Sequence, residues 1–303
     1  MRKELLIAGA LLVTAIAVRT SEAQEAAGLS PVLQNIKSNH KVRLGYRESS
    51  IPFSFLDEAK RPIGYSLELC EAIVEQISKE VDDPGLGVEY VKVTSESRIQ
   101  AVLEDKIDLE CGSTTANAER TKRVAFSLVI FIAGTKLMVP KSSVVRDISD
   151  LRGKSIVVTK GTTNEEAIRS AASRLGLALR IEQGEDHEQS YGLLASGKVD
   201  AFATDDILLY GLIARHRAQD RFRVTGDLLS YEPYGIMFRK GDEQLANVVE
   251  RTFRELAANH DLVPLYHKWF VSRLPTGEKL GVPIAPELEQ GFNVLDSTQG
   301  STD

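Results

Sequence analysis

The sequence predicts an α/β protein built from two similar lobes. Short apolar segments typical of strands alternate with amphipathic segments typical of helices from Lys41 onward, and the alternation restarts after residues 136–140. One seven-residue pattern also occurs once in each half of the chain. At 303 residues the chain is long enough for two domains.

Each half is predicted to form a sheet with helices on both faces, because strands and helices alternate within it. In the first half the pattern predicts strands over 42–46, 88–93 and 107–111, with helices over 66–79 and 98–103. In the second half it predicts strands over 155–159, 179–183 and 199–204, with helices over 164–175, 189–196 and 206–218. A later helix over 243–259 and the aromatic residues Tyr266, Trp269 and Phe270 are predicted to form a closing segment.

The repeated pattern is VLEDKID at 102–108 and LASGKVD at 194–200. Each copy is interpreted as a helix end, a tight turn with a lysine, and an aspartate that opens a buried strand. Five residues beyond these aspartates stand Ser113 and Asp205, just past the carboxyl ends of their strands, where open α/β sheets place ligand sites. The two lobes are therefore predicted to share a cleft, the alternative being a chance match between two α/β segments.

The first residues are typical of a secretory signal peptide. Basic residues at 2–3 precede an apolar run over 5–18, and the small residues Ser21 and Ala23 occupy the −3 and −1 places of a cleavage site. The run is shorter than the ~20 residues that a spanning helix needs. We expect residues 1–23 to be removed after Ala23 and the mature chain to lie in the periplasm; an uncleaved anchor is the alternative.

Composition excludes some classes of function. The net charge of −6, with no run of arginine and lysine, gives a nucleic-acid partner no electrostatic support. The sequence contains no HExxH, GxSxG or phosphate-binding glycine motif, so no metal, cofactor or catalytic group is predicted. In an exported chain Cys70 and Cys111 either form a disulfide or remain two buried thiols, and the sequence leaves both open.

Short polar motifs follow the predicted strands. They are RESS at 47–50, TSESR at 94–98, CGSTT at 111–115 with Glu119 and Arg120 after it, GTTN at 161–164, DH at 186–187 and TDD at 204–206. Singly, these residues could be helix caps or solvated charges. Together they place arginines near a helix start whose free N–H groups suit a carboxylate.

A family resemblance rests on these motifs. The stretch 111–120, CGSTTANAER, followed by Phe126 and Ser127, resembles periplasmic amino-acid-binding proteins of ABC transporters, and in particular the glutamate/aspartate-binding branch. The other motifs occur in that family's order, and the resemblance covers about 33–270. It implies a type II periplasmic binding protein fold with two hinge crossings, near 135–140 and 230–237. The expected division is lobe 1 over 24–138, lobe 2 over 139–230, a return to lobe 1 over 231–295, and a disordered tail over 296–303.

The resemblance also implies a role for each site residue. Arg120 would grip the ligand's α-carboxylate, with Thr163 from the other lobe, and Asp205 would accept the α-ammonium. Ser113 and Thr115 would support these backbone groups. The side-chain carboxylate would be surrounded by a second set of residues, namely Arg47, Ser95, Arg98 and His187.

Charge alone supports this assignment of two residue sets to the two ends of the ligand. A ligand with two carboxylates and one ammonium needs two cationic anchors and one anionic anchor. The implied partners are L-glutamate or L-aspartate and a membrane permease, with the protein a monomer. Two alternatives stay open: an enzyme on the same fold resembling cyclohexadienyl dehydratase, and a broader carrier that also takes glutamine and asparagine. His187 leaves room for the broader carrier, since its charge depends on pH.

Overall fold

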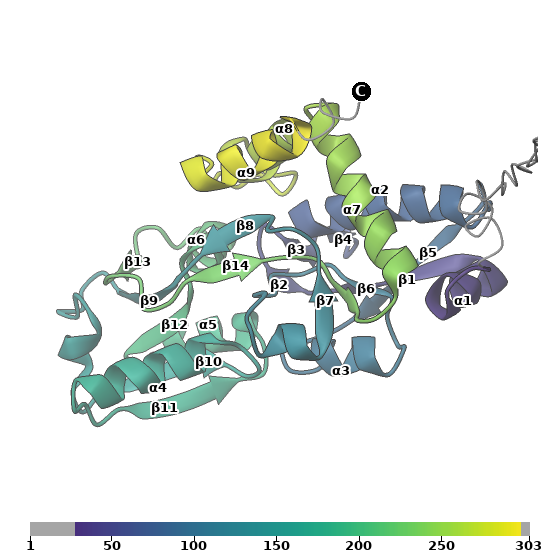
Figure 1. The fold of residues 1–303 in the computed structure, drawn as a ribbon. Coiled ribbons are helices and arrows are strands. Elements are labelled where there is room, and N and C mark those ends of the chain that lie inside the picture. The colour runs from purple at the N-terminus through teal and green to yellow at the C-terminus, as the bar shows by residue number, and fades with distance from the viewer. Residues whose placement is uncertain (1–27, 298–303) are drawn as a thin grey trace, which may run out of the picture.

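The protein consists of two α/β lobes that lie side by side, as Figure 1 shows for a computed structural model describing residues 28–297. The predicted signal peptide lies outside the described residues. Helix α9 (Pro286–Ser297) includes the first two residues of the predicted tail, so that part is helical, and the rest of the tail also lies outside the described residues.

The first lobe is organised around a five-stranded sheet. In spatial order its strands are β5 (Gly87–Lys92), β1 (Lys41–Tyr46), β6 (Leu109–Glu110), β15 (Met237–Arg239) and β7 (Val124–Phe126). Strand β1 lies parallel to β5 and β6, and β15 runs antiparallel between β6 and β7. A small sheet follows β1 and contains β2 (Ser49–Ser50), β3 (Ser54–Leu56) and β4 (Pro62–Ile63). The helices of the chain before the first crossing are α1 (Pro31–Asn39), α2 (Tyr65–Glu80), α3 (Arg98–Leu103) and a 3-10 helix over Arg120–Lys122.

The second lobe repeats this arrangement. Its strand order is β11 (Arg180–Gly184), β10 (Ser155–Thr159), β12 (Ala201–Asp205), β9 (Thr135–Pro140) and β13 (Phe222–Thr225), again with three parallel strands and an antiparallel fourth. Its helices are α4 (Asn164–Arg174), α5 (His187–Ala195) and α6 (Asp206–Arg215). Alternate residues of β10 enter different apolar clusters, Ile156 and Val158 one and Val157 the other, so the sheet is buried on both faces. The predicted pair of similar lobes is confirmed.

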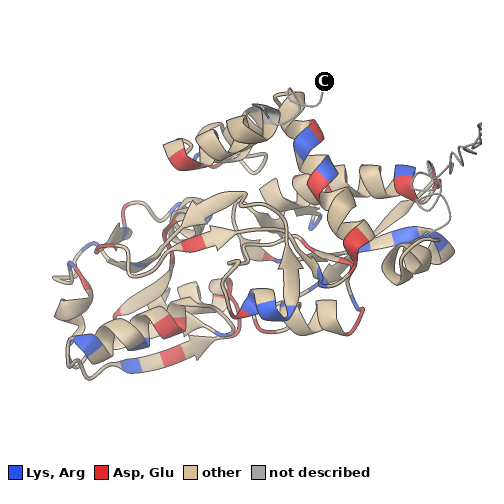
Figure 2. Cartoon of the chain, in the orientation of Figure 1, with Lys and Arg blue, Asp and Glu red and all other residues tan. Residues whose placement is uncertain are grey.

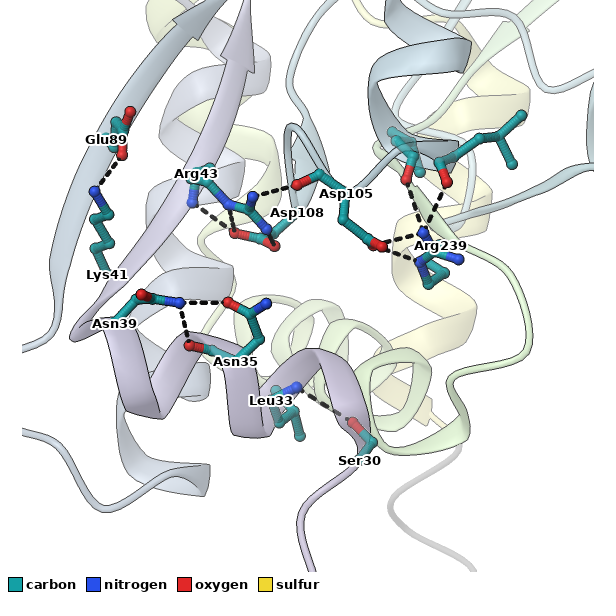
Figure 3. Close-up of polar contacts among 12 residues, drawn as sticks. Ser30, Leu33, Asn35, Asn39, Lys41, Arg43, Glu89, Asp105, Asp108 and Arg239 are labelled. Carbon is teal, nitrogen blue, oxygen red and sulfur yellow. Dashed lines mark hydrogen bonds and ion pairs between the residues drawn. The ribbon is translucent and has the colours of Figure 1, made fainter.

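The repeated sequence pattern performs the same structural task in both lobes. The Asp108 carboxylate accepts a hydrogen bond from the backbone N–H of Arg43, the third residue of β1, at 2.7 Å and pairs with the Arg43 guanidinium (Figure 3). In the second lobe the Asp200 carboxylate accepts the backbone N–H of Ser155 at 2.8 Å, at the start of β10. Asp108 thus connects the turn before β6 to the first half of β1, and Asp200 connects the turn before β12 to the start of β10.

The lobes are joined by a two-stranded antiparallel ribbon of β8 (Phe131–Ala133) and β14 (Glu232–Tyr234). The second crossing matches the expected region at 230–237. The first was expected at 135–140, but those residues form β9 and pair with β12 and β13 inside the second sheet, so the crossing lies at β8 instead. The expected boundary at residue 138 therefore falls within a strand of the second lobe.

After β15 the chain packs on α2 of the first lobe through α7 (Glu243–Ala258), and it later also meets α6 of the second lobe, where Glu278 lies 3.7 Å from Arg215. Helices α7 and α8 (Leu262–Tyr266), a π-helical turn over His267–Val271, and α9 follow in order. The aromatic side chains predicted for the closing segment are buried, and Phe131 of the crossing ribbon stacks on Tyr266 and Phe270. The closing segment thus anchors one strand of the ribbon to the first lobe.

Cys70 and Cys111 form a disulfide, which decides the alternative that the sequence left open. The bond joins α2 to the residue that follows β6, with 6.2 Å between the Cα atoms. Cys111 comes directly before the loop of Gly112 and Ser113, and Ser66 of α2 donates to the Gly112 carbonyl at 2.8 Å. The loop after β6 is therefore held to α2 at two neighbouring points.

Charges of both signs are interspersed on the outer elements, as Figure 2 shows along α4, β11 and α7. Among residues 28–297, no helix is both long and apolar enough to cross a membrane. Within the same residues, no three His, Cys, Asp or Glu side chains are grouped so that they could hold a metal ion.

Candidate functional site

A small cavity lies between the lobes, where the carboxyl ends of the strands of both sheets meet. It is lined by seven of the nine predicted site residues: Ser95, Arg98, Ser113, Thr115, Thr163, His187 and Asp205, together with Thr162, Asn164 and Leu208. The other two, Arg47 and Arg120, hydrogen-bond to lining residues. The cavity has a volume of about 10 Å³, room for about one water molecule, so an amino acid enters only when the lobes separate.

Three buried arginines of the first lobe converge on this cavity. Arg47 donates to Ser95 Oγ at 2.6 Å, and Arg120 donates to the Thr115 carbonyl at 3.0 Å. Arg98 and Arg120 both reach across the cleft to the Gly161 carbonyl, at 3.4 and 3.3 Å. These residues therefore connect the two lobes, and the alternative that Arg98 and Arg120 are solvated surface charges is wrong.

The electrostatics of the cavity favour an anion. Burial, followed by repulsion from Arg98, lowers the pKa of Arg47 to about 9 and that of Arg120 to about 10, and burial also lowers the pKa of Arg98. With these pKa values Arg47 and Arg120 remain cations at neutral pH. Arg47 Nη1, Arg98 Nε and Ser113 Oγ are buried without a hydrogen-bond partner among the described residues. A carboxylate of a ligand would supply acceptors to buried donors that otherwise cost free energy.

Asp205 provides the opposite charge at the end of β12. Its carboxylate accepts a hydrogen bond from Asn164 Nδ2 at 2.7 Å and another from the Tyr234 hydroxyl. Burial, followed by repulsion from Glu232, raises the pKa of Asp205 to about 7. A ligand ammonium beside Asp205 would stabilise the charged carboxylate that burial disfavours.

His187 is buried in the cavity wall, where its ring nitrogen Nδ1 lies 3.0 Å from Thr159 Oγ1. Burial, and then the charges of Arg47 and Arg98, lower the pKa of His187 well below its ordinary value. His187 is therefore neutral at physiological pH. It lines the cavity as a neutral group that can hydrogen-bond.

The hydroxyls of Thr115 and Thr163 have a partner that the sequence did not predict. Both donate to the same oxygen of Glu232, at 2.7 and 2.6 Å. Thr163 occupies the N-cap position of α4 but makes no side-chain capping bond, so the alternative of a simple helix cap is wrong.

Two buried glutamates near the site were missed. Glu232 lies in β14, and Glu110 lies in β6, where it accepts a hydrogen bond from the Thr114 hydroxyl at 2.5 Å. The sequence did contain a signal for Glu110, because this glutamate stands inside the predicted strand over 107–111 and a buried glutamate needs a polar or charged partner. Glu232 stands in the predicted crossing, but nothing in its local sequence indicated burial.

Fold and site together define a two-lobed binding protein that encloses a small charged solute. The family model for bacterial extracellular solute-binding proteins, family 3, matches residues 42–272, and the chain belongs to this family. The protein is therefore a binding protein that works outside the cytoplasm, rather than an enzyme.

Within this family, the chain is similar to several individual amino-acid-binding proteins. The chain is 40% identical over 287 residues to the L-glutamate/L-aspartate-binding protein of Pseudomonas aeruginosa, covering 94% of this chain and 95% of that one. It is 36% identical to the glutamate/aspartate import solute-binding protein of Escherichia coli, covering 88% and 89%. Among solved structures, a mutant of ArgBP from T. maritima matches with a TM-score of 0.71 and 26% identity, covering 80% and 100%.

Proposed function

We propose that this protein captures L-glutamate or L-aspartate between its lobes and delivers it to the membrane permease of an ABC transporter. The observation that carries the proposal is a cavity lined by Arg98 and the buried carboxylate of Asp205, with Arg47 and Arg120 buried beside it and bonded to lining residues. Arg47 and Arg98 each keep a donor without a partner among the described residues. This set complements two carboxylates and one ammonium. The glutamate/aspartate-binding names of the relatives support the same ligands.

In the proposed arrangement the arginines serve different ends of the ligand. Arg120 and the start of α4 at Thr163 bind the α-carboxylate, while Asp205 accepts the ammonium. Arg47, Arg98 and Ser95 bind the side-chain carboxylate, with His187 as a neutral neighbour. Each charged hydrogen bond contributes about 1.5–3 kcal/mol, and micromolar binding needs about 8 kcal/mol net, so four or five such contacts suffice after ordering costs.

The same arrangement disfavours amides. Glutamine or asparagine in this pocket would leave a buried arginine without a counter-charge, which costs more than the lost attraction alone. We therefore favour a carrier that is selective for glutamate and aspartate over one that also takes glutamine and asparagine. The proposal includes a monomer that is exported by the signal peptide over residues 1–23 and cleaved after Ala23.

The test is isothermal titration of the mature, ligand-stripped protein with glutamate, aspartate, glutamine and asparagine. Tight binding of the two acids alone is expected. Equal binding of the amides would overturn the assigned roles of Arg47 and Arg98, and binding of none would overturn the proposed function. Incubation with prephenate or arogenate provides the control for the dehydratase alternative, and no product is expected.

A further inference from the structure

Glu232 is a buried glutamate that has no role toward the ligand in the proposed arrangement. It belongs to β14 of the crossing ribbon, where it pairs with Ala133 of β8, and its side chain is 2% exposed. One carboxylate oxygen, Oε2, accepts the hydroxyl of Thr115 from the first lobe and the hydroxyl of Thr163 from the second. A single atom of the hinge region thus connects one cavity-lining hydroxyl of each lobe.

This contact determines what the two hydroxyls can offer a ligand. A threonine hydroxyl carries one proton and two lone pairs. When the proton is donated to Glu232, only lone pairs remain, so Thr115 Oγ1 and Thr163 Oγ1 face the cavity as acceptors. An acceptor suits an ammonium and repels a carboxylate, which leaves the backbone N–H groups at the start of α4 to bind the carboxylate.

We infer that Glu232 is a positioning residue that holds the hydroxyls of Thr115 and Thr163 as acceptors for the α-ammonium of the ligand. The site then selects amino acids over dicarboxylates that lack the ammonium, such as glutarate. This inference rests on the proposed function and adds a determinant to it. Since the two hydroxyls come from different lobes, the complete set of acceptors forms only when the lobes are together, and ammonium recognition is coupled to closure.

The charge around the contact agrees with this role. Asp205 lines the cavity and Glu232 is bonded to two lining residues, and the repulsion between these two buried carboxylates contributes to the raised pKa of Asp205. An ammonium between them would relieve that repulsion. A dicarboxylate without an ammonium would leave it in place and add further negative charge.

The test compares the binding of glutamate and glutarate by isothermal titration in the wild type and in Glu232→Leu and Glu232→Gln variants. Leucine removes the acceptor, so the hydroxyls can turn and donate. Glutamate affinity is expected to fall at least tenfold while glutarate affinity falls less than threefold or rises. Glutamine keeps one acceptor oxygen and is expected to retain most of the discrimination. Glu110→Gln is the matched control, a buried glutamate bonded to Thr114 within one lobe, and it should change both affinities by the same factor.

Thr163→Val provides a second test with a nearly isosteric side chain, in case Glu232→Leu does not fold. It should weaken glutamate but not glutarate; equal weakening of both would assign the hydroxyl to a carboxylate and overturn the inference. If the wild type binds glutamate and the ratio of affinities survives in Glu232→Leu, the inference fails alone. If the wild type binds neither ligand, the proposed function fails with it.

Discussion

The backbone at Gly161 packs tightly against the first lobe beside the cavity, and replacing this glycine with alanine should prevent closure. A Cβ at this position would lie 2.5 Å from Glu96 Cα, 2.6 Å from Glu96 N and 2.7 Å from the Ser95 carbonyl carbon. All three atoms are backbone atoms of the first lobe, so no side-chain rotation can relieve the overlap. The lobes of Gly161→Ala must stay further apart.

The cost follows from the bonds that this separation breaks. The Gly161 carbonyl accepts hydrogen bonds from Arg98 and Arg120. Each charged hydrogen bond is worth about 1.5–3 kcal/mol, so the loss of both costs about 3 kcal/mol at the lower limit, or about a hundredfold in Kd. Gly161 also has φ +71°, a conformation that costs an L-residue roughly 1–2 kcal/mol whether or not the lobes are closed.

The two costs can be separated by experiment. Gly197 also lies in the second lobe with φ +74°, but a Cβ added there would have no described heavy atom within 4 Å, so Gly197→Ala carries only the backbone strain. Both variants should lose about 1–2 kcal/mol in denaturant unfolding, whereas only Gly161→Ala should lose about a hundredfold in glutamate affinity by titration. A Gly161→Ala protein that binds within threefold of the wild type would refute the reasoning.

Three further predictions concern the site and the disulfide. Arg120→Ala should abolish binding of every amino acid, whereas Arg98→Ala should mainly erase the preference for acids over amides; titration with all four ligands checks both, and normal glutamate binding by both variants would contradict the roles. Burial raises the pKa of Asp205 to about 7, and the ligand ammonium needs the charged carboxylate of this residue. Glutamate affinity should therefore fall by up to about tenfold per pH unit below pH 7. Titration at pH 8 and pH 6 in two buffers should reveal proton release on binding at the lower pH. Reduction of the Cys70–Cys111 bond, which spans 41 residues, should lower the unfolding free energy by about 4 kcal/mol, measured as a shift of the denaturant midpoint with and without reductant, and an unchanged midpoint would contradict it.

The sequence predicted those features that depend on local pattern. The alternation of strands and helices located both sheets, and the repeated aspartates pointed to Ser113 and Asp205, which line the same cavity. This succeeded because a residue just past a parallel strand must lie at the carboxyl edge of the sheet, whatever the rest of the chain does.

Features that depend on distant partners were missed. Residues 135–140 are separated from β8 by Gly134 alone, and only their pairing with β12 and β13 shows that they belong to the second sheet. The neutrality of His187 follows from burial beside two arginines of the other lobe, which are far away in the sequence. The role of Glu232 depends on hydroxyls from both lobes and is invisible in its local sequence.

The attachment of the crossing ribbon has a mechanical consequence. Strand β8 is joined through Gly134 to β9, and β14 is joined through 235–236 to β15. Both β9 and β15 are the fourth strand of a five-stranded sheet and are hydrogen-bonded on both sides. A small rotation of the ribbon therefore rotates a whole sheet as a rigid body, and the displacement grows with distance from the ribbon. Occupancy of the cavity thus becomes a displacement at the far surfaces of the lobes, where a permease could sense it without touching the solute.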